Sequence, residues 1–289
     1  PRDKGAMLAG GVAGHAPAFS GRGGSGLVTV AVSGDVFASP SSKQICSGVD
    51  LAPTDKGIVT IVLNYTGDCL NFGLASEKAR SAFHSEGKGR DIEQLIGGDD
   101  RSEGRSNGGL VGRRAVSGAA FTAKVLGAAS EKGDDVQKIA HLGRTMVKNF
   151  VTVGSSLDHC HVPGRSTDPK ERGALSQSAV EIGMGIHNEP GAKHIENKPS
   201  GEDLIKEMLE LLLREDDPER SFVKFNKDDD PVLIINNLGG MSSIELGAIA
   251  AEARTQIERD WNLRLSRVYC GTYVTSLNAP GFNISLLNH

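Results

Sequence analysis

The sequence predicts an α/β protein, because short apolar runs alternate with helical patterns along its 289 residues. Residues 58–63, Ile-Val-Thr-Ile-Val-Leu, form a short β-branched run, so we expect a buried strand there. Residues 232–236 show the same pattern. A loop rich in Asn and Gly follows each run, and open α/β sheets bind their ligands in loops at this position.

Capping residues mark the starts of the predicted helices. Ser41 with Gln44, and Ser242 with Glu245, fit the capping box, in which two side chains satisfy backbone amides reciprocally. After Ser200, Leu and Met residues recur at helical spacing, which predicts a helix with its apolar face on the core.

The remaining segments suggest two domains. Residues 134–150 have the pattern of a further amphipathic helix, whereas the polar segments 97–109 and 215–230 are expected to be surface loops. A chain of this length accommodates two domains. We expect a break near residue 140, with an N-terminal α/β subdomain at 1–140 and a C-terminal α/β subdomain at 141–289.

The charge balance argues against nucleic acid and membrane partners. Net charge is −4 and aromatic residues make up 4%, so there is no basic footprint and no stacking platform for bases. The four cysteines show no CxxC spacing, which favours reduced thiols. No apolar run reaches membrane-spanning length, and the first residues do not form a signal peptide. We therefore expect a cytoplasmic protein.

Two motif-like segments do not carry a site. Residues 21–26 satisfy G-x-G-x-x-G, but no strand is expected before them, so a dinucleotide would lack its strand–turn–helix cradle. His159, Cys160 and His161 are adjacent, and neighbouring side chains on an extended chain point to opposite faces. Structural packing is the better interpretation, and no metal site is expected.

Three loops carry groups capable of acid–base chemistry. His187 lies in a Gly-flanked turn beside Glu189, where a histidine can shuttle protons, bind a metal, act as a nucleophile or be structural. His15 follows paired glycines, in a ligand loop or simply in a tight turn. Asp68 stands just beyond a buried strand, the place of a general base or a helix cap. These residues alone name no substrate.

Several ordered motifs resemble the substrate-binding (K) domain of the dihydroxyacetone (glycerone) kinases. They extend from about Gly10 to Leu287, nearly the whole chain. In chain order they are VFASP (36–40), NYTGDCLNFGLA (64–75), GRR (112–114), VPG (162–164), GMGIHNEPG (183–191), NNLGG (236–240), GTY (271–273) and PGF (280–282).

The resemblance implies a fold of two layered α/β domains with mixed and parallel sheets, and a triose substrate. In this family the GIH histidine adds to the ketone carbon of dihydroxyacetone, and the hemiaminal fixes the triose for phosphorylation of a terminal hydroxyl. His187 stands at that position, Asp68 matches the general base, and His15 matches its partner in the glycine loop. The substrate-binding positions are occupied by Gly11, Val12, Ala13, Gly14 and Leu63.

The resemblance also implies that the chain itself holds no cofactor. ATP and Mg²⁺ belong to a separate domain or subunit, the helical ATP-binding (L) domain, and homodimers are expected from the family. The implied enzyme is a glycerone kinase of glycerol metabolism, a phosphotransferase that acts on an alcohol group.

The chain departs from the family at several positions. The family's loop GGGSGHEP is replaced by residues 10–17, GGVAGHAP, so that Val12, Ala13 and Ala16 differ. Other departures are Phe19 for a histidine, Leu63 for a lysine and Asn188 for a glycine. One lost charged contact costs about 1.5–3 kcal/mol, roughly a ten- to hundredfold loss in affinity.

Three hypotheses follow. The chain is the dihydroxyacetone-binding part of a glycerone kinase, or a catalytically impaired triose-binding sensor module that acts on a partner, or an unstable, non-functional truncate. His187, Asp68 and His15 favour the first, whereas Val12, Ala16 and Leu63 favour the other two.

Overall fold

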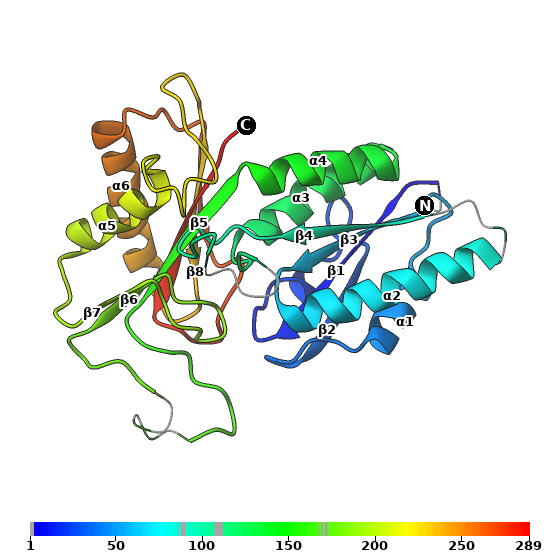
Figure 1. Cartoon of the computed structure of the whole chain (residues 1–289), viewed down its shortest axis with the longest axis horizontal. Coiled ribbons are helices and arrows are strands. Elements are labelled where there is room, and N and C mark those ends of the chain that lie inside the picture. The colour runs from blue at the N-terminus through cyan, green and yellow to red at the C-terminus, as the bar shows by residue number, and fades with distance from the viewer. Residues whose placement is uncertain are drawn as a thin grey trace. The chain divides into compact units, whose positions relative to one another are not determined.

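The chain forms two compact units in a computed structural model, which describes residues 3–85, 87, 91–106, 112–166, 168, 170 and 173–289 (Figure 1). Unit 1 comprises Pro1–Gly98 and Gly118–Val147, and unit 2 comprises Asp99–Ser117 and Lys148–His289. The break expected near residue 140 falls within helix α4 (Val136–Lys148). After a first crossing at Gly98 and a return at Gly118, the chain leaves unit 1 again only where this helix ends, because buried α4 residues such as Ile139 hold the helix to unit 1.

Unit 1 is a doubly wound parallel sheet with the strand order β2-β1-β3-β4. The strands are β1 (Ala6–Ala13), β2 (Val30–Val36), β3 (Ile58–Leu63) and β4 (Ile92–Gly97). Helices α1 (Ser42–Leu51) and α2 (Thr66–Ser85) cover one face, and α3 (Gly118–Glu131) and α4 cover the other (Figure 1). All of β3 and seven of the eight β1 residues are buried, as expected for strands covered on both faces.

The strand order places a topological switch between β1 and β3, because β2 lies on one side of this pair and β4 on the other. Open α/β sheets bind ligands at the carboxyl ends of such strands. In unit 1 these ends lead into the glycine loop at 10–16 and into Asn64–Asp68. The topology therefore indicates one ligand-binding edge in this unit.

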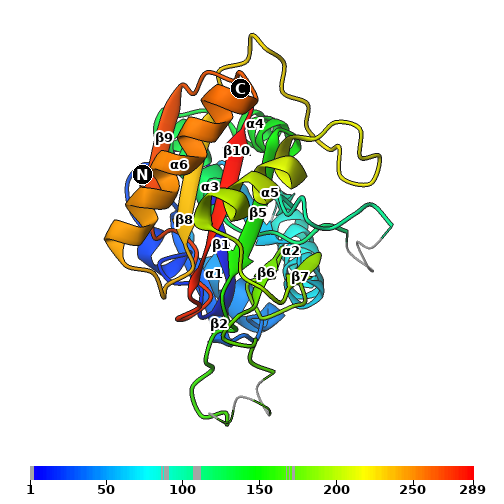
Figure 2. The same ribbon diagram turned by 90° about the vertical axis from the view of Figure 1, so that its left-hand side faces the viewer.

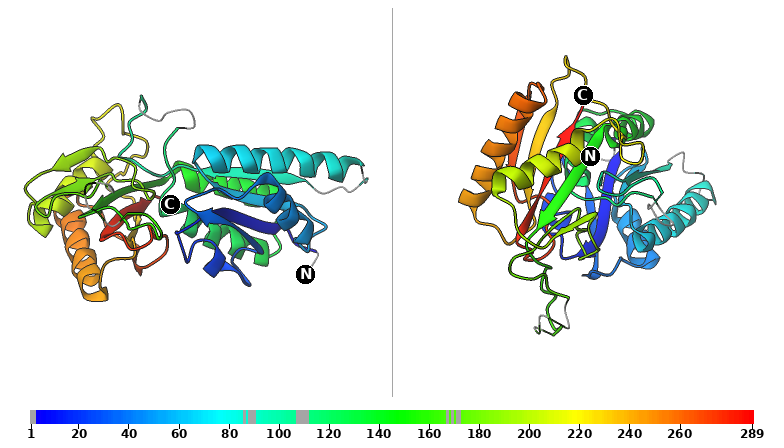
Figure 3. Two further views of the ribbon diagram at one scale, coloured as in Figure 1. Left: turned by 90° about the horizontal axis from the view of Figure 1, so that it is seen from below. Right: turned by 60° about the vertical axis from the view of Figure 1, so that its left-hand side comes forward.

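Unit 2 is built on a mixed six-stranded sheet of order β7-β6-β5-β10-β8-β9. Its strands are β5 (Phe150–Ser156), β6 (Val180–Ile182), β7 (Lys193–Ile195), β8 (Val232–Asn237), β9 (Arg267–Gly271) and β10 (Gly281–Leu287). Helices α5 (Gly201–Leu213) and α6 (Ser243–Asp260) lie together over one face (Figures 2 and 3). Their apolar faces join the central strands in one core, which contains Met208, Ile257 and Ile284.

The local signals in the sequence predicted these elements well. The runs 58–63 and 232–236 are strands β3 and β8, and both capping boxes form with the predicted residues. Ser200 caps α5 by accepting a hydrogen bond from the Asp203 amide. The amphipathic pattern at 134–150 is α4.

The expectation of a surface loop at 97–109 is wrong for its first half. Asp99, Asp100, Arg101 and Ser102 are each 3% exposed or less and belong to unit 2. Their polar groups are buried because they find partners, among them Arg114 and Thr152. Residues 107–109 lie outside the described part of the chain.

Candidate functional site

The glycine loop begins inside strand β1. A Cβ atom on Gly10 would overlap the carbonyl oxygen of Val32 in the neighbouring strand, so close pairing requires glycine here. Gly14 has a φ of 111°, which only glycine adopts readily. A cavity of about 70 Å³ lies against this loop, lined by Gly11, Val12, Ala13, Gly14, Ala16, Ala18, Phe19, Ser20, Val32 and Ser33. Four of the predicted substrate-binding residues, Gly11, Val12, Ala13 and Gly14, therefore lie along one cavity.

Asp68 lies in the first turn of α2 and is 1% exposed. A Cβ atom built on Gly11 would lie 3.6 Å from Asp68 Oδ2 and 3.4 Å from the Leu63 side chain. The structure thus brings Asp68, Leu63 and the glycine loop together at the switch point of unit 1.

His15 is buried beside an aromatic ring. Its imidazole lies 5.7 Å from the ring of Phe37, measured between centroids, and the side chain is 1% exposed. Phe37 belongs to the VFASP motif and has a φ of 52°. Phe37 was part of a motif that carried the family resemblance, but it had no predicted role. A contact between residues far apart in the chain leaves no local pattern in the sequence.

Neither Lys124 nor Arg113 takes the place of the lysine that the family resemblance implies before NYTGD. Leu63 is buried in its place. The Lys124 ammonium donates to the Gly26 carbonyl at 3.0 Å, and the Arg113 guanidinium lies 3.7 Å from the centre of the Phe222 ring. Because these two cations make contacts elsewhere, neither restores the positive charge that is lost where Leu63 replaces a lysine.

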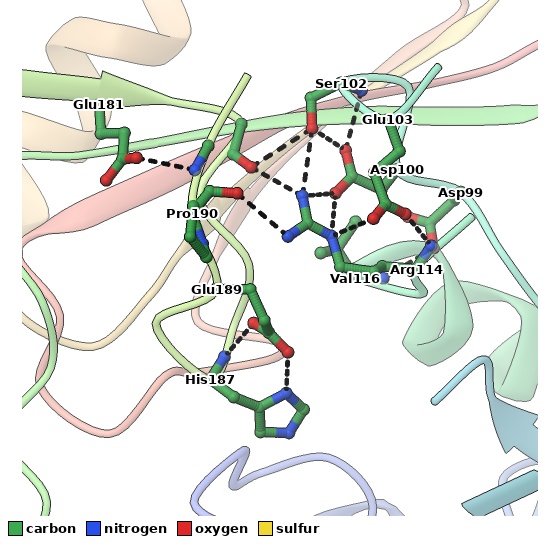
Figure 4. A network of polar contacts seen from close by, with 12 residues as sticks. Asp99, Asp100, Ser102, Glu103, Arg114, Val116, Glu181, His187, Glu189 and Pro190 are labelled. Atoms are coloured by element: carbon green, nitrogen blue, oxygen red, sulfur yellow. Dashed lines mark hydrogen bonds and ion pairs between the residues drawn. The ribbon is translucent and has the colours of Figure 1, made fainter. Parts of the chain in front are cut away.

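His187 stands in the turn between β6 and β7 of unit 2, and Glu189 holds it twice (Figure 4). The backbone amide of His187 donates to Glu189 Oε2 at 2.9 Å, and the ring nitrogen Nδ1 lies 2.8 Å from Oε1. A carboxylate accepts only, so Nδ1 carries the proton, and the lone pair of the neutral ring is on Nε2. This is the orientation that a nucleophilic imidazole needs.

The charge state of Glu189 follows from this contact. Burial alone would raise the pKa of Glu189, but the hydrogen bonds from the side chain and backbone of His187, with the imidazole charge, lower it to about 2. The carboxylate is therefore ionised at neutral pH, and it can balance a positive charge on the ring.

Asn188 stands where the family resemblance implies a glycine, and its own backbone conformation is one that favours glycine. Its φ is 65°, in the left-handed region that Asn tolerates better than most residues. Its side chain accepts from the Cys160 amide at 2.9 Å and donates to the Cys160 carbonyl at 3.2 Å. This departure from the family is accommodated, and it ties the turn to the segment after β5.

The sequence also singled out the four cysteines, and His159 and His161 on either side of Cys160. All four cysteines are free, and burial, aided by the charge of Asp68, raises the pKa of the Cys69 thiol.

Within the described ranges, no group of three or more His, Cys, Asp or Glu side chains is arranged to hold a metal ion. No helix there is long and apolar enough to cross a membrane. Turn residues and a short 3-10 helix (Ser20–Arg22) precede the rest of the G-x-G-x-x-G segment, where a dinucleotide site needs a strand.

The predicted catalytic residues divide between the two units. His15 and Asp68 belong to unit 1, and His187 belongs to unit 2. The sequence prediction missed the buried pair Asp100 and Arg114, whose partners lie near His187 in unit 2. Arg114 is part of the GRR motif, which was a signal of resemblance but not of a role.

A parallel doubly wound unit and a mixed-sheet unit, each with chemistry-bearing groups on its loops, define a two-unit α/β protein. The sequence model of the Dak1 domain matches residues 1–289. The dihydroxyacetone kinase of Pichia angusta is 43% identical over 296 residues, which cover 99% of this chain and 48% of that protein. The chain belongs to the Dak1 domain family, the substrate-binding (K) domain of the dihydroxyacetone kinases.

Solved structures agree with this assignment. The dihydroxyacetone kinase of C. freundii has a TM-score of 0.84 and 31% identity, and the match covers 100% of this chain and 48% of that one. A dihydroxyacetone kinase operon co-activator has a TM-score of 0.85 and 26% identity, and the match covers 100% of this chain and 83% of the co-activator. The chain spans about half the length of the curated relatives that it matches.

Proposed function

We propose that this chain is the triose-binding part of a glycerone kinase, in which His187 holds dihydroxyacetone covalently for phosphorylation of a terminal hydroxyl. The observation that carries the proposal is the hydrogen bond from His187 Nδ1 to Glu189, at 2.8 Å, in a chain of this family. A tether of this kind fixes the orientation of a small and flexible substrate, and it rejects glycerol, which has no carbonyl.

The proposed addition balances charge within the turn. The Nε2 lone pair of His187 bonds to the ketone carbon, and the carbonyl π electrons move to the oxygen, which takes a proton from the solvent and becomes a hydroxyl. The ring keeps its Nδ1 proton and becomes positively charged. The ionised Glu189, with its pKa near 2, compensates that charge, as the aspartate does in a Ser-His-Asp triad.

Unit 1 supplies the acid–base groups in this proposal. Asp68 accepts the proton of the attacking hydroxyl, and His15 assists it from the glycine loop. The close approach of Gly11 to Asp68 and Leu63 supports a shared edge for these groups. Val12 and Leu63 make that edge more apolar than the family pattern, so we expect weaker triose binding than in a relative with the lysine.

The phosphoryl group comes from outside this chain. We propose that ATP and Mg²⁺ are held by a separate ATP-binding domain or subunit, and ATP supplies the phosphate that the oriented hydroxyl receives. The full sequence contains no G-x-x-x-x-G-K-[S/T] segment that would cradle a nucleotide phosphate. A homodimer is proposed on the family resemblance alone.

Carbon-13 NMR with dihydroxyacetone labelled at its ketone carbon tests the tether directly. Added to the full chain, the label is expected to leave the carbonyl region and appear where sp³ carbons with two heteroatoms resonate. His187→Ala should keep the label in the carbonyl region, and labelled glycerol serves as the matched ligand without a ketone. A carbonyl signal that wild-type protein leaves unchanged at saturating triose would sink the proposal.

A triose-sensing module is the second candidate. The co-activator similarity covers 83% of that protein, and the departures at Val12, Ala16 and Leu63 fall at the loop and strand end that would hold the triose. Turnover separates the two functions. We would add the ATP-binding domain of a related dihydroxyacetone kinase and assay triose phosphate; a tethered triose without product favours the sensor.

A further inference from the structure

One buried guanidinium bonds to both ends of the turn that carries His187. Arg114 Nη2 donates to the Gly183 carbonyl at 2.8 Å, and Nη1 donates to the Pro190 carbonyl at 3.5 Å (Figure 4). We propose that Arg114 is a positioning residue, which sets the place and orientation of the His187 ring. This inference rests on the proposed function, because it assigns to Arg114 the control of the tethering step.

Acidic side chains hold Arg114 from its other side. Its Nη2 lies 2.8 Å and its Nε 3.0 Å from Asp100 Oδ2, and Nε lies 3.4 Å from Glu103 Oε1. Ser102 donates to Asp100 Oδ1 from its amide at 2.9 Å and from its hydroxyl at 2.5 Å. The Arg114 side chain is 10% exposed and that of Asp100 2%, so the guanidinium has one well-defined orientation.

Arg114 and the carboxylate that holds the imidazole approach the same glycine of the turn. A Cβ atom on Gly185 would lie 2.8 Å from Arg114 Nη1 and would overlap Oε2 of Glu189. Gly185 therefore lets the guanidinium and the Glu189 carboxylate approach the same stretch of backbone. Through the turn and through Glu189, the position of Arg114 determines where His187 lies.

These contacts depend on the planar shape of the guanidinium as well as on its charge. A planar fork can serve one carboxylate and two carbonyl groups at once, whereas a lysine ammonium is a single point on a flexible stem. Attack on a ketone needs the reacting atoms about 3–3.5 Å apart with aligned orbitals, and a misplacement of about 1 Å costs about 100-fold. Lysine at position 114 would keep the charge and lose the alignment.

The test compares Arg114→Lys with Arg101→Lys in the full chain. Arg101 also belongs to unit 2 and is 0% exposed, but its guanidinium donates to the carbonyl groups of Val223 and Arg214, away from the turn. Three quantities are measured: the melting temperature, the NMR signal of the His187 Nδ1 proton, and the affinity for labelled dihydroxyacetone from its ketone carbon. The proton signal needs no triose.

We expect both variants to lose melting temperature to a similar extent. Only Arg114→Lys should lose the slowly exchanging Nδ1 signal and weaken adduct formation, by about 100-fold. Because Arg114→Lys could fail to fold, Ser102→Ala serves as the milder variant. It removes a hydroxyl 3.3 Å from the Gly183 carbonyl, and it should weaken the adduct about tenfold with the fold intact.

Two results would overturn the inference. One is an unchanged Nδ1 signal and unchanged triose affinity in a folded Arg114→Lys or Ser102→Ala protein. The other is an equal loss of both in Arg101→Lys, which would mean general loosening of unit 2. If wild-type protein forms no adduct, the proposed function fails, and the Nδ1 proton signal alone decides whether Arg114 positions the ring.

Discussion

Glu189 is the residue on which the state of the His187 ring depends. Its carboxylate accepts a hydrogen bond from the Nδ1–H group of the ring and so fixes the tautomer. The carboxylate remains ionised because the hydrogen bonds from His187 outweigh the cost of burial. A glutamate two residues from a histidine was visible in the sequence, but its orientation was not. The orientation depends on the backbone of the turn, which brings the carboxylate back onto the His187 amide.

The depressed pKa of Glu189 predicts a pH dependence of stability. Because the folded-state pKa lies below the usual 4.5, the ionised carboxylate stabilises the fold above pH 4.5, and this contribution disappears as the pH falls towards 2. The Glu189→Gln variant has no carboxylate at this position, so this contribution to stability is absent from it at every pH. We would measure the free energy of unfolding in urea at neutral pH and near the lower end of that pH range. The difference between wild type and Glu189→Gln should shrink as the pH falls, and a constant difference would contradict a depressed pKa of Glu189.

Elements whose signals are local were predictable. Strands β3 and β8 are indicated by β-branched runs, and the starts of α1 and α6 by capping boxes. Each of these signals depends only on residues that are close together in the sequence. The buried segment 99–102 was not predictable in this way. Its composition is polar, and the partners that allow its burial, such as Thr152 and Gly183, come from distant parts of the chain.

The His187 turn gives a prediction at the scale of one element. Asn188 carries a positive φ and two hydrogen bonds to Cys160. Asn188→Gly relieves the backbone strain but loses these bonds, so unfolding should become easier by about 1 kcal/mol. Asn188→Ala keeps a Cβ atom without the polar group, and should cost about 2–3 kcal/mol. Denaturant unfolding of both variants checks the order, and equal losses would mean that the φ angle is relaxed in the alanine variant.

At the scale of the whole molecule, the proposed chemistry is divided between the two units. His187 and its supporting residues are supplied by unit 2, whereas His15 and Asp68 stand at the switch point of unit 1. The sequence indicated His187, His15 and Asp68 as candidates, because each is in a loop after a strand or in a glycine-rich turn, but it did not indicate Asp100 and Arg114. Nor did it predict that Asp100 and Arg114 belong to unit 2, where Arg114 donates to the Gly183 carbonyl at the start of the His187 turn.

This division predicts that tethering and phosphoryl transfer can be separated by mutation. Asp68→Asn keeps the size of the side chain in the first turn of α2 and removes the base. The triose should still form its adduct with His187, because that step uses groups of unit 2, while transfer should fall by about 10²–10⁴-fold. The label at the ketone carbon reports the first step, and triose phosphate formed with an added ATP-binding domain reports the second. A loss of the adduct would show that Asp68 takes part in tethering, and unchanged turnover would remove it from the role of base.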